Sequence, residues 1–166
     1  TNPFDPASLN LMNGFTPPMA PNMFTGQSFV MGTDDQGRDL LSAIIYGLRV
    51  SLFVGLMSVL LAMGIGVSLG LVAGYVGGWL DNLIMRIADI QLTFPSILIA
   101  MLIFGVLRGI IPPDLRDEMA IFVLIAAIGL SEWVPFARTV RATTLVEKEK
   151  EYVQAARLIG LRRGKI

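Results

Sequence analysis

The chain has 166 residues, of which 54% are hydrophobic and 16% charged, and its mean hydropathy of +0.66 is well above that of ordinary soluble domains. We therefore expect a protein of the lipid bilayer. Thirteen basic residues balance thirteen acidic ones, so no overall positive field attracts nucleic acid, and the lack of cysteine and histidine excludes disulfides, imidazole bases and the usual zinc sites.

The N-terminal segment is the least regular part of the sequence. Its first 31 residues place five prolines among Asn, Gly, Met and Phe and show no sustained period, which predicts an irregular loop. The first residue is Thr1 rather than Met, and no basic stretch with a cleavable apolar core precedes it. We interpret this end as a cut edge and the chain as a fragment.

Three apolar stretches predict membrane-spanning helices near 48–76, 90–107 and 119–137. The first rests on a run of 31 consecutive uncharged residues, 50–80, more than the roughly 20 that a helix needs to cross a bilayer. The second has 18, and Pro95 is expected to kink it or to mark the true start of its helix. The third is long enough only if Glu132 is accepted near its end.

Basic residues are concentrated at the C-terminal end and predict the direction of the spans. Segment 138–166 contains eight of the thirteen, and the positive-inside rule places such a segment in the cytoplasm. Three crossings then place residues 1–45 outside, the link 77–89 inside and the loop 108–118 outside. The sequence thus predicts an all-α, polytopic bundle made of an extracytoplasmic segment, 1–45, and a partial transmembrane domain, 46–166.

Small residues recur at every fourth position along the first span, at Ser58, Ala62, Gly66, Gly70, Gly74 and Gly78. On a helix this spacing gives a narrow stripe along one face, which allows a second helix to approach closely in lipid. We predict that Gly66, Gly70 and Gly74 are packing positions, with no necessary part in a transport pathway.

Charged residues near the spans have two interpretations each. An ionised carboxylate within a span is costly unless it faces a cavity or a partner, so Glu132 is a candidate functional residue. The alternative is a carboxylate at the interface, hydrated or paired with Arg86. Asp81, Arg86 and Asp89 are interpreted as the polar face of a short interfacial helix, exposed to water or headgroups.

The C-terminal tail predicts an amphipathic helix over 147–160, ended by Gly160. One face carries a helical i, i+3, i+4, i+7 pattern, formed by Tyr152, Ala155, Ala156 and Ile159. Small residues with basic neighbours suit insertion into a groove of a partner protein, and a helix lying on anionic lipid fits the same pattern. The ending GLRRGKI lacks the spacing and the Ser or Thr of a phosphate-binding loop, so we exclude nucleotide binding by this chain.

Three blocks of the sequence resemble a known family. QAARLIG, Gln154–Gly160, resembles the cytoplasmic loop signature of ABC importer permeases, with Gln in place of the usual Glu, and YVQAAR matches the Tyr-Val-x-Ala-Ala-Arg form of the peptide branch. GTDDQGRD, Gly32–Asp39, is similar to the hallmark of the dipeptide, oligopeptide and nickel permeases. GYVGGWLDNLIMRIADIQLTFPS, residues 74–96, resembles the link of the same branch.

The resemblance implies a permease subunit with six spans, of which this chain carries the second through fourth. It implies an extracytoplasmic signature formed by Gly32, Thr33, Asp34, Gly37, Arg38 and Asp39. It also implies an ATPase-coupling helix with Tyr152, Gln154, Ala155, Ala156, Arg157 and Gly160 in the cytoplasmic loop 138–166. The implied partners are separate ABC ATPase subunits, a second, homologous but different permease chain, and an extracytoplasmic substrate-binding protein.

We interpret the chain as part of the translocation pathway of an ATP-driven ABC importer for short peptides or a related small solute. It would be a multi-pass protein of the bacterial inner membrane, without enzymatic activity, cofactor or metal of its own. Peptide, nickel and other solutes share these blocks, so the solute stays open. The alternatives are a secondary carrier or channel, in which Glu132 binds the coupling ion, and a non-transporting scaffold, which leaves the tail and GTDDQGRD unexplained.

Overall fold

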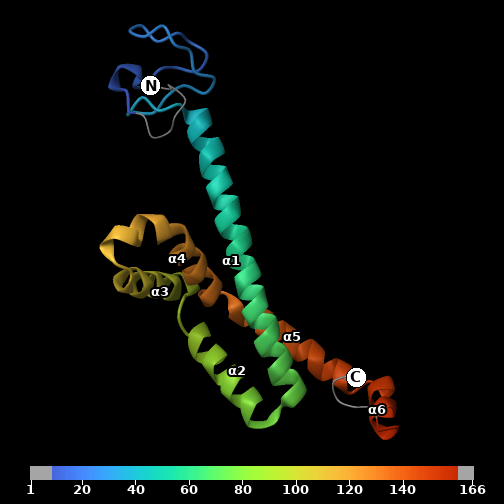
Figure 1. The fold of residues 1–166 in the computed structure, drawn as a ribbon. Coiled ribbons are helices and arrows are strands. Elements are labelled where there is room, and N and C mark those ends of the chain that lie inside the picture. Colours follow the sequence, from blue (N-terminus) through green and yellow to red (C-terminus); the bar gives the residue numbers. More distant parts are fainter. Residues whose placement is uncertain (1–8, 161–166) are drawn as a thin grey trace. The chain divides into compact units, whose positions relative to one another are not determined.

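The protein is described by a computed structural model over residues 9–160. Within this range it consists of helices, turns and two isolated bridges, Pro21 with Ser28 and Thr33 with Asp39. The elements, in chain order, are η1 (Leu11–Asn13), α1 (Leu40–Val76), α2 (Gly78–Leu92), α3 (Ser96–Ile110), η2 (Pro113–Leu115), α4 (Arg116–Ser131), α5 (Trp133–Lys148) and α6 (Glu151–Leu158) (Figure 1). The prediction of an all-α membrane protein fold is confirmed.

The chain divides into two compact units, one up to Phe53 and one from Val54 onward. In the first unit, residues 9–39 form the irregular segment, and its interior is mostly polar. Asn13, Thr16 and Asn22 are buried there and hydrogen-bond to one another or to the backbone, around the buried ring of Phe29. The segment is irregular, as predicted, and polar contacts order it.

The second unit contains breaks within two of the three predicted spans. α1 alone is long and apolar enough to cross a membrane, and α2 with α3 and η2–α4 with α5 qualify only if each bent pair is one span. The first pair bends by 99° and the second by 41°. The predicted runs 90–107 and 119–137 are therefore not single helices. Pro95 directly precedes α3 and has an extended backbone. The proline ring disfavours a helical conformation in the residue before it, so the helix is interrupted there.

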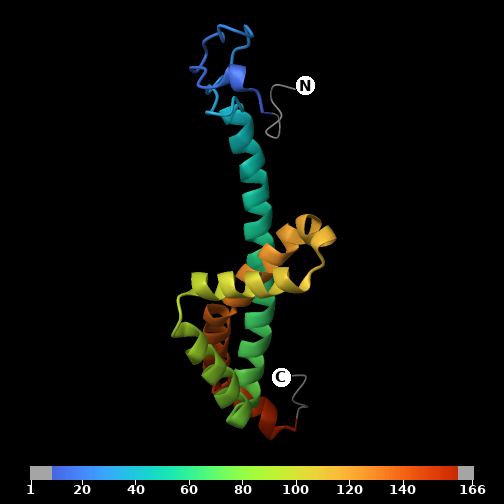
Figure 2. The same cartoon turned by 90° about the vertical axis from the view of Figure 1, so that its left-hand side faces the viewer.

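The core of the second unit lies where α1, α2 and α5 meet. It consists of small and medium-sized buried residues, Ala73, Ile84, Ala88, Trp133, Val134 and Ala137. α3 and α4 pack side by side, and α2 contacts α5 (Figures 1 and 2). Gly129 of α4 also lies against the side chain of Leu61 in α1. We call α1, α2 and α5 the helix frame.

The predicted helix over 147–160 is also divided. α5 continues to Lys148, the backbone turns at Glu149 and Lys150, and α6 begins at Glu151. Gly160 has a φ of +78°, a left-handed conformation that ends a helix and favours glycine. The basic residues Arg162, Arg163 and Lys165 of the tail lie outside the described residues.

Candidate functional site

α6 presents the predicted docking face to its surroundings. Tyr152 and Ile159 are 62% and 77% exposed, Ala155 is exposed, and Ala156 is half-buried. Val153, on another side of the helix, is buried, so it attaches α6 to the rest of the unit. Among residues 9–160, this helix therefore has one anchored side and one side that carries small residues and is partly or fully exposed.

A polar network fixes the corner between α5 and α6. The Tyr152 hydroxyl donates to one carboxylate oxygen of Glu147 at 2.8 Å, and the Lys150 ammonium donates to the other at 2.5 Å. The Glu147 carboxylate raises the pKa of both Tyr152 and Lys150, chiefly because each donates a hydrogen bond to it. Both side chains keep their protons at neutral pH, so the corner stays hydrogen-bonded.

The glycine stripe of α1 lies against α5. A Cβ atom added to Gly66 would be 2.5 Å from the carbonyl oxygen of Trp133, and one added to Gly70 would be 2.4 Å from that of Ala137. At Gly74 the added atom would be 2.7 Å from Cβ of Thr144. These distances are shorter than any ordinary contact, so α5 can approach the backbone of α1 this closely only because the stripe lacks side chains.

Lys148 ties the end of α5 to the end of α1. Its ammonium donates to the carbonyl oxygens of Gly74 at 3.3 Å and Tyr75 at 3.1 Å, both in the last turn of α1. Carbonyls in a last helical turn have no partner within the helix, and the macrodipole favours a positive charge there. α1 and α5 are thus held together along the stripe and at the C-terminal ends of both helices, which the sequence predicts to be on the cytoplasmic side.

Two ion pairs hold α2 against α5. Arg141 forms a bidentate pair with Asp81, with N–O distances of 2.5 and 2.7 Å, and Arg138 pairs with Asp89. Asp81 is only 13% exposed. The interpretation as a solvated polar face is therefore wrong for Asp81, whereas Arg86 and Asp89 are exposed as expected, although Asp89 is paired with Arg138. The sequence contained one signal for these ion pairs. The two aspartates are eight residues apart in α2 and the two arginines are three apart in α5, so each helix carries its two like charges on one face.

Gln91 links the two breaks in the spans. It lies in the last turn of α2, and its side-chain oxygen accepts a hydrogen bond from Nε1 of Trp133 at 2.8 Å. Its amide nitrogen donates to the carbonyl oxygen of Ser131 at 2.7 Å. Ser131 and Trp133 flank Glu132, where α4 ends and α5 begins, so one amide binds both sides of that break. Gln91 was not among the residues predicted from the sequence.

Glu132 lies at the break itself, not inside a continuous helix. Its backbone N–H donates to the carbonyl oxygen of Ile128 at 3.1 Å and so completes α4. Among residues 9–160 its carboxylate forms no ion pair with Arg86, so that expected pairing is wrong. The same described range has no cluster of three Asp or Glu residues that could hold a metal ion.

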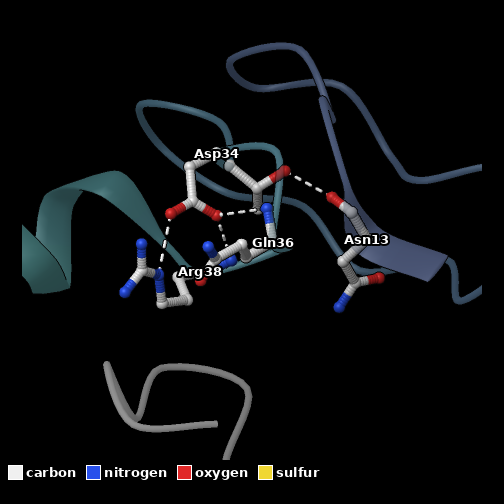
Figure 3. Close-up of polar contacts among 5 residues, drawn as sticks. Asn13, Asp34, Gln36 and Arg38 are labelled. Atoms are coloured by element: carbon white, nitrogen blue, oxygen red, sulfur yellow. Dashed lines mark hydrogen bonds and ion pairs between the residues drawn. The ribbon is translucent and has the colours of Figure 1, made fainter. Parts of the chain in front are cut away.

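The signature segment Gly32–Asp39, which the sequence predicts to be extracytoplasmic, forms a tight turn just before α1 (Figure 3). The Asp34 carboxylate accepts hydrogen bonds from the backbone N–H groups of Gln36 and Arg38 and from Nε of Arg38. Burial acts to raise the pKa of Asp34, but these hydrogen bonds and the charge of Arg38 outweigh it and hold the pKa below its usual value. The resulting stabilisation is present at neutral pH and is lost as the pH falls through that lowered pKa.

The backbone conformation and contacts of the other signature residues explain why these residue types occur there. Gly37 has a φ of +75°, and a Cβ atom there would lie 1.8 Å from the carbonyl oxygen of Asn10. Gly32 has a φ of +78° and is similarly crowded. The Thr33 hydroxyl accepts from the N–H of Thr16, and Asp39 accepts from the N–H and hydroxyl of Ser42, which caps the start of α1.

Comparison with known proteins places this geometry in a family. The family described as "Binding-protein-dependent transport system inner membrane component" matches residues 66–166. The dipeptide transport system permease protein DppC of Alkalihalophilus pseudofirmus is 40% identical over 81% of this chain and 41% of its own length. The protein of the same name from Haemophilus influenzae is 38% identical, over 95% and 50%.

The oligopeptide transport system permease protein OppC of Bacillus subtilis is 34% identical over 98% of the chain and 48% of its own length. The chain belongs to the family of binding-protein-dependent transport system inner membrane components. It spans half or less of the length of these three curated relatives. The resemblance that the sequence blocks suggested is confirmed.

Proposed function

We propose that this chain is part of a multi-pass permease subunit of an ATP-driven importer in the bacterial inner membrane, and that the imported solute is a short peptide. The names of the relatives, which specify dipeptide and oligopeptide transport, support the class of solute. The description of the family supports dependence on an extracytoplasmic binding protein. A second permease chain would complete the pathway.

The observation that carries the proposal is the placement of α6. Within the described range, Tyr152, Ala155 and Ile159 of its docking face are exposed and Ala156 is half-buried, while Val153 and the corner at Glu147 attach the helix to α5. A helix with small residues on an accessible face and a firm attachment behind it is suited to a groove in a partner protein. We assign that groove to an ABC ATPase subunit.

The helix frame gives this docking a mechanical consequence. α5 continues from the α6 corner, touches α1 along Gly66, Gly70 and Gly74, and holds α2 by ion pairs. A displacement of α6 would therefore move three helices together. Alternating access requires two arrangements of the spans whose balance the nucleotide state of the ATPase biases, and the breaks at Thr93–Pro95 and at Glu132 are the places where α3 and α4 can move against the frame.

Purification of the full-length permease from its native membrane tests the proposal. We expect an ATPase with a Walker motif to co-purify, and vesicles that contain the reconstituted complex and binding protein to accumulate a labelled dipeptide only with ATP. Uptake driven by an ion gradient, without ATP, would support the secondary carrier and contradict the proposal. If the complex is stable but no uptake occurs under either condition, the result would support the non-transporting scaffold.

A further inference from the structure

The two helix breaks of the second unit enclose a small cavity of about 190 Å³. Its walls come from the end of α2, the start of α3, the end of α4 and the start of α5, and include Gln91, Phe94, Ser96, Ser131 and Glu132. Broken helices in membrane transporters expose backbone and side-chain polar groups where a substrate can reach them. Nothing in the coupling role of α6 accounts for this cavity.

Glu132 is the only ionisable residue that lines the cavity. In the part of the chain that the structure describes, its carboxylate has neither a hydrogen bond nor an ion-pair partner. The nearest α5 cations are already engaged, since Arg138 binds Asp89 and Arg141 binds Asp81. The Gln91 amide is also occupied, by Trp133 and Ser131. The carboxylate is therefore left facing the cavity without a counter-ion.

Two helix ends meet at this place. Glu132 lies between the C-terminal end of α4, which carries a partial negative charge, and the N-terminal end of α5, which carries a partial positive charge, so neither end takes the place of a counter-ion. Phe94, Val134 and Pro135 supply apolar walls, which weaken screening by water. A lone carboxylate in such a setting is costly, and binding of a positively charged group offsets this cost.

We propose that this cavity binds the primary ammonium group at the amino terminus of the transported peptide, with Glu132 as its counter-ion. The inference rests on the proposed function as a peptide importer. The cavity of about 190 Å³ is well above the roughly 10–15 Å³ that one water molecule needs on the same measure, so it has room for an ammonium group. The hydroxyls of Ser96 and Ser131 can accept hydrogen bonds from the same group. The site thus selects a free amino terminus and leaves the rest of the peptide unspecified.

The test compares uptake of labelled Ala-Ala with uptake of N-acetyl-Ala-Ala, which lacks the ammonium. Vesicles contain the complete importer, with permease, partner permease, ATPases and binding protein, and ATP is supplied. The readout is the ratio of kcat/KM for the two peptides. We expect the wild type to prefer the free dipeptide and Glu132→Gln to lower this ratio by about 10- to 100-fold, the value of one charge-assisted hydrogen bond.

Two variants control the comparison. Glu132→Asp keeps the charge on a side chain one methylene shorter, and we expect it to retain a preference for the free dipeptide even if Glu132→Gln assembles poorly. Glu118→Gln removes an exposed carboxylate from the first turn of the same helix, α4, and is expected to leave the ratio unchanged.

The outcomes separate the inference from the function on which it rests. If the wild-type importer takes up neither peptide with ATP, the proposed function fails and the inference with it. If the wild type takes up dipeptide and Glu132→Gln has the wild-type ratio, the inference alone fails. An equal loss of preference in Glu118→Gln would also overturn it, because the effect would then be one of general charge.

Discussion

Gly70 is the position in α1 where added volume meets the least yielding neighbour. A Cβ atom there would lie 2.4 Å from the carbonyl oxygen of Ala137 and 3.0 Å from its carbonyl carbon and Cα. Non-bonded heavy atoms attract best at about 3.5 Å or more, so α5 must move away from α1 by about 1 Å. The obstructing atoms belong to helix backbone, which cannot rotate aside as a side chain does.

This crowding sets the expected size of the effect of Gly70→Ala. Alanine is the better helix former by about 1 kcal/mol, so the substitution is favourable where space is open. Overpacking of a close contact costs typically about 1–3 kcal/mol, and the ion pairs and the Lys148 contact of the frame oppose the movement that would relieve it. With the gain in helix propensity subtracted, we expect Gly70→Ala to lower the free energy of unfolding by up to about 2 kcal/mol.

Gly64 provides the matched control, because it lies in the same helix with no atom within 4 Å of an added Cβ. Gly64→Ala is expected to leave stability unchanged or to raise it by up to about 1 kcal/mol. Thermal unfolding of the full-length subunit in detergent, followed by the loss of monodisperse protein, measures both. Equal midpoints for the two variants would show that the stripe does not hold α5, and Gly70→Leu should then also assemble normally.

Three further predictions concern topology, an ion pair and a turn. An impermeant thiol reagent applied to intact cells should label Ser28→Cys but not Thr143→Cys, because basic residues flank the second position. Asp81→Asn should lower the free energy of unfolding by about 1–3 kcal/mol, because it leaves the partly buried Arg141 without a charged acceptor. Exchange of the two charged residues, Asp81→Arg together with Arg141→Asp, should restore part of the loss in a double-mutant cycle. Gly37→Ala should expose the extracytoplasmic segment to limited proteolysis, because its Cβ would lie 1.8 Å from a carbonyl oxygen.

Each of these has an outcome that contradicts it. Labelling of Thr143→Cys in intact cells would contradict the predicted topology. Purely additive effects of the two charge changes would mean that Asp81 and Arg141 do not stabilise each other. For the turn, Gly26→Ala is the control, since Gly26 also has a positive φ, of 70°, but open space around it. Equal protease sensitivity of the two glycine variants would assign the effect to backbone strain alone.

The sequence predicted those parts of the fold that depend on local composition. The uncharged run of α1 and the small residue at every fourth position are visible without coordinates, because lipid requires the first and close helix approach requires the second. The family blocks were equally local, and Gly37 shows why one of them is so constrained: its φ and the nearby carbonyl admit only glycine.

Pro95 predicted the start of α3, but the break at Glu132 and the contacts across both breaks were not predictable in the same way. Hydropathy is continuous through Thr93–Pro95 and nearly so through Glu132, so a run of apolar residues does not reveal a 99° or a 41° bend. Asp81 looks solvated in the sequence until α5 supplies Arg141 from 60 positions away. Gln91 carries no sequence signal, because an amide in a helix is unremarkable until its two partners are placed.

Binding of the ABC ATPase to the full-length permease in detergent tests the coupling role of α6 most directly. We compare the wild type with Ala156→Trp, which overpacks the docking face, and Ala156→Ser, which preserves its size. The account predicts that the Trp variant weakens ATPase binding by about 5- to 150-fold, corresponding to about 1–3 kcal/mol, and that the Ser variant binds like the wild type. Undiminished ATPase binding by Ala156→Trp would contradict the account and favour a helix that lies on lipid, where tryptophan strengthens attachment.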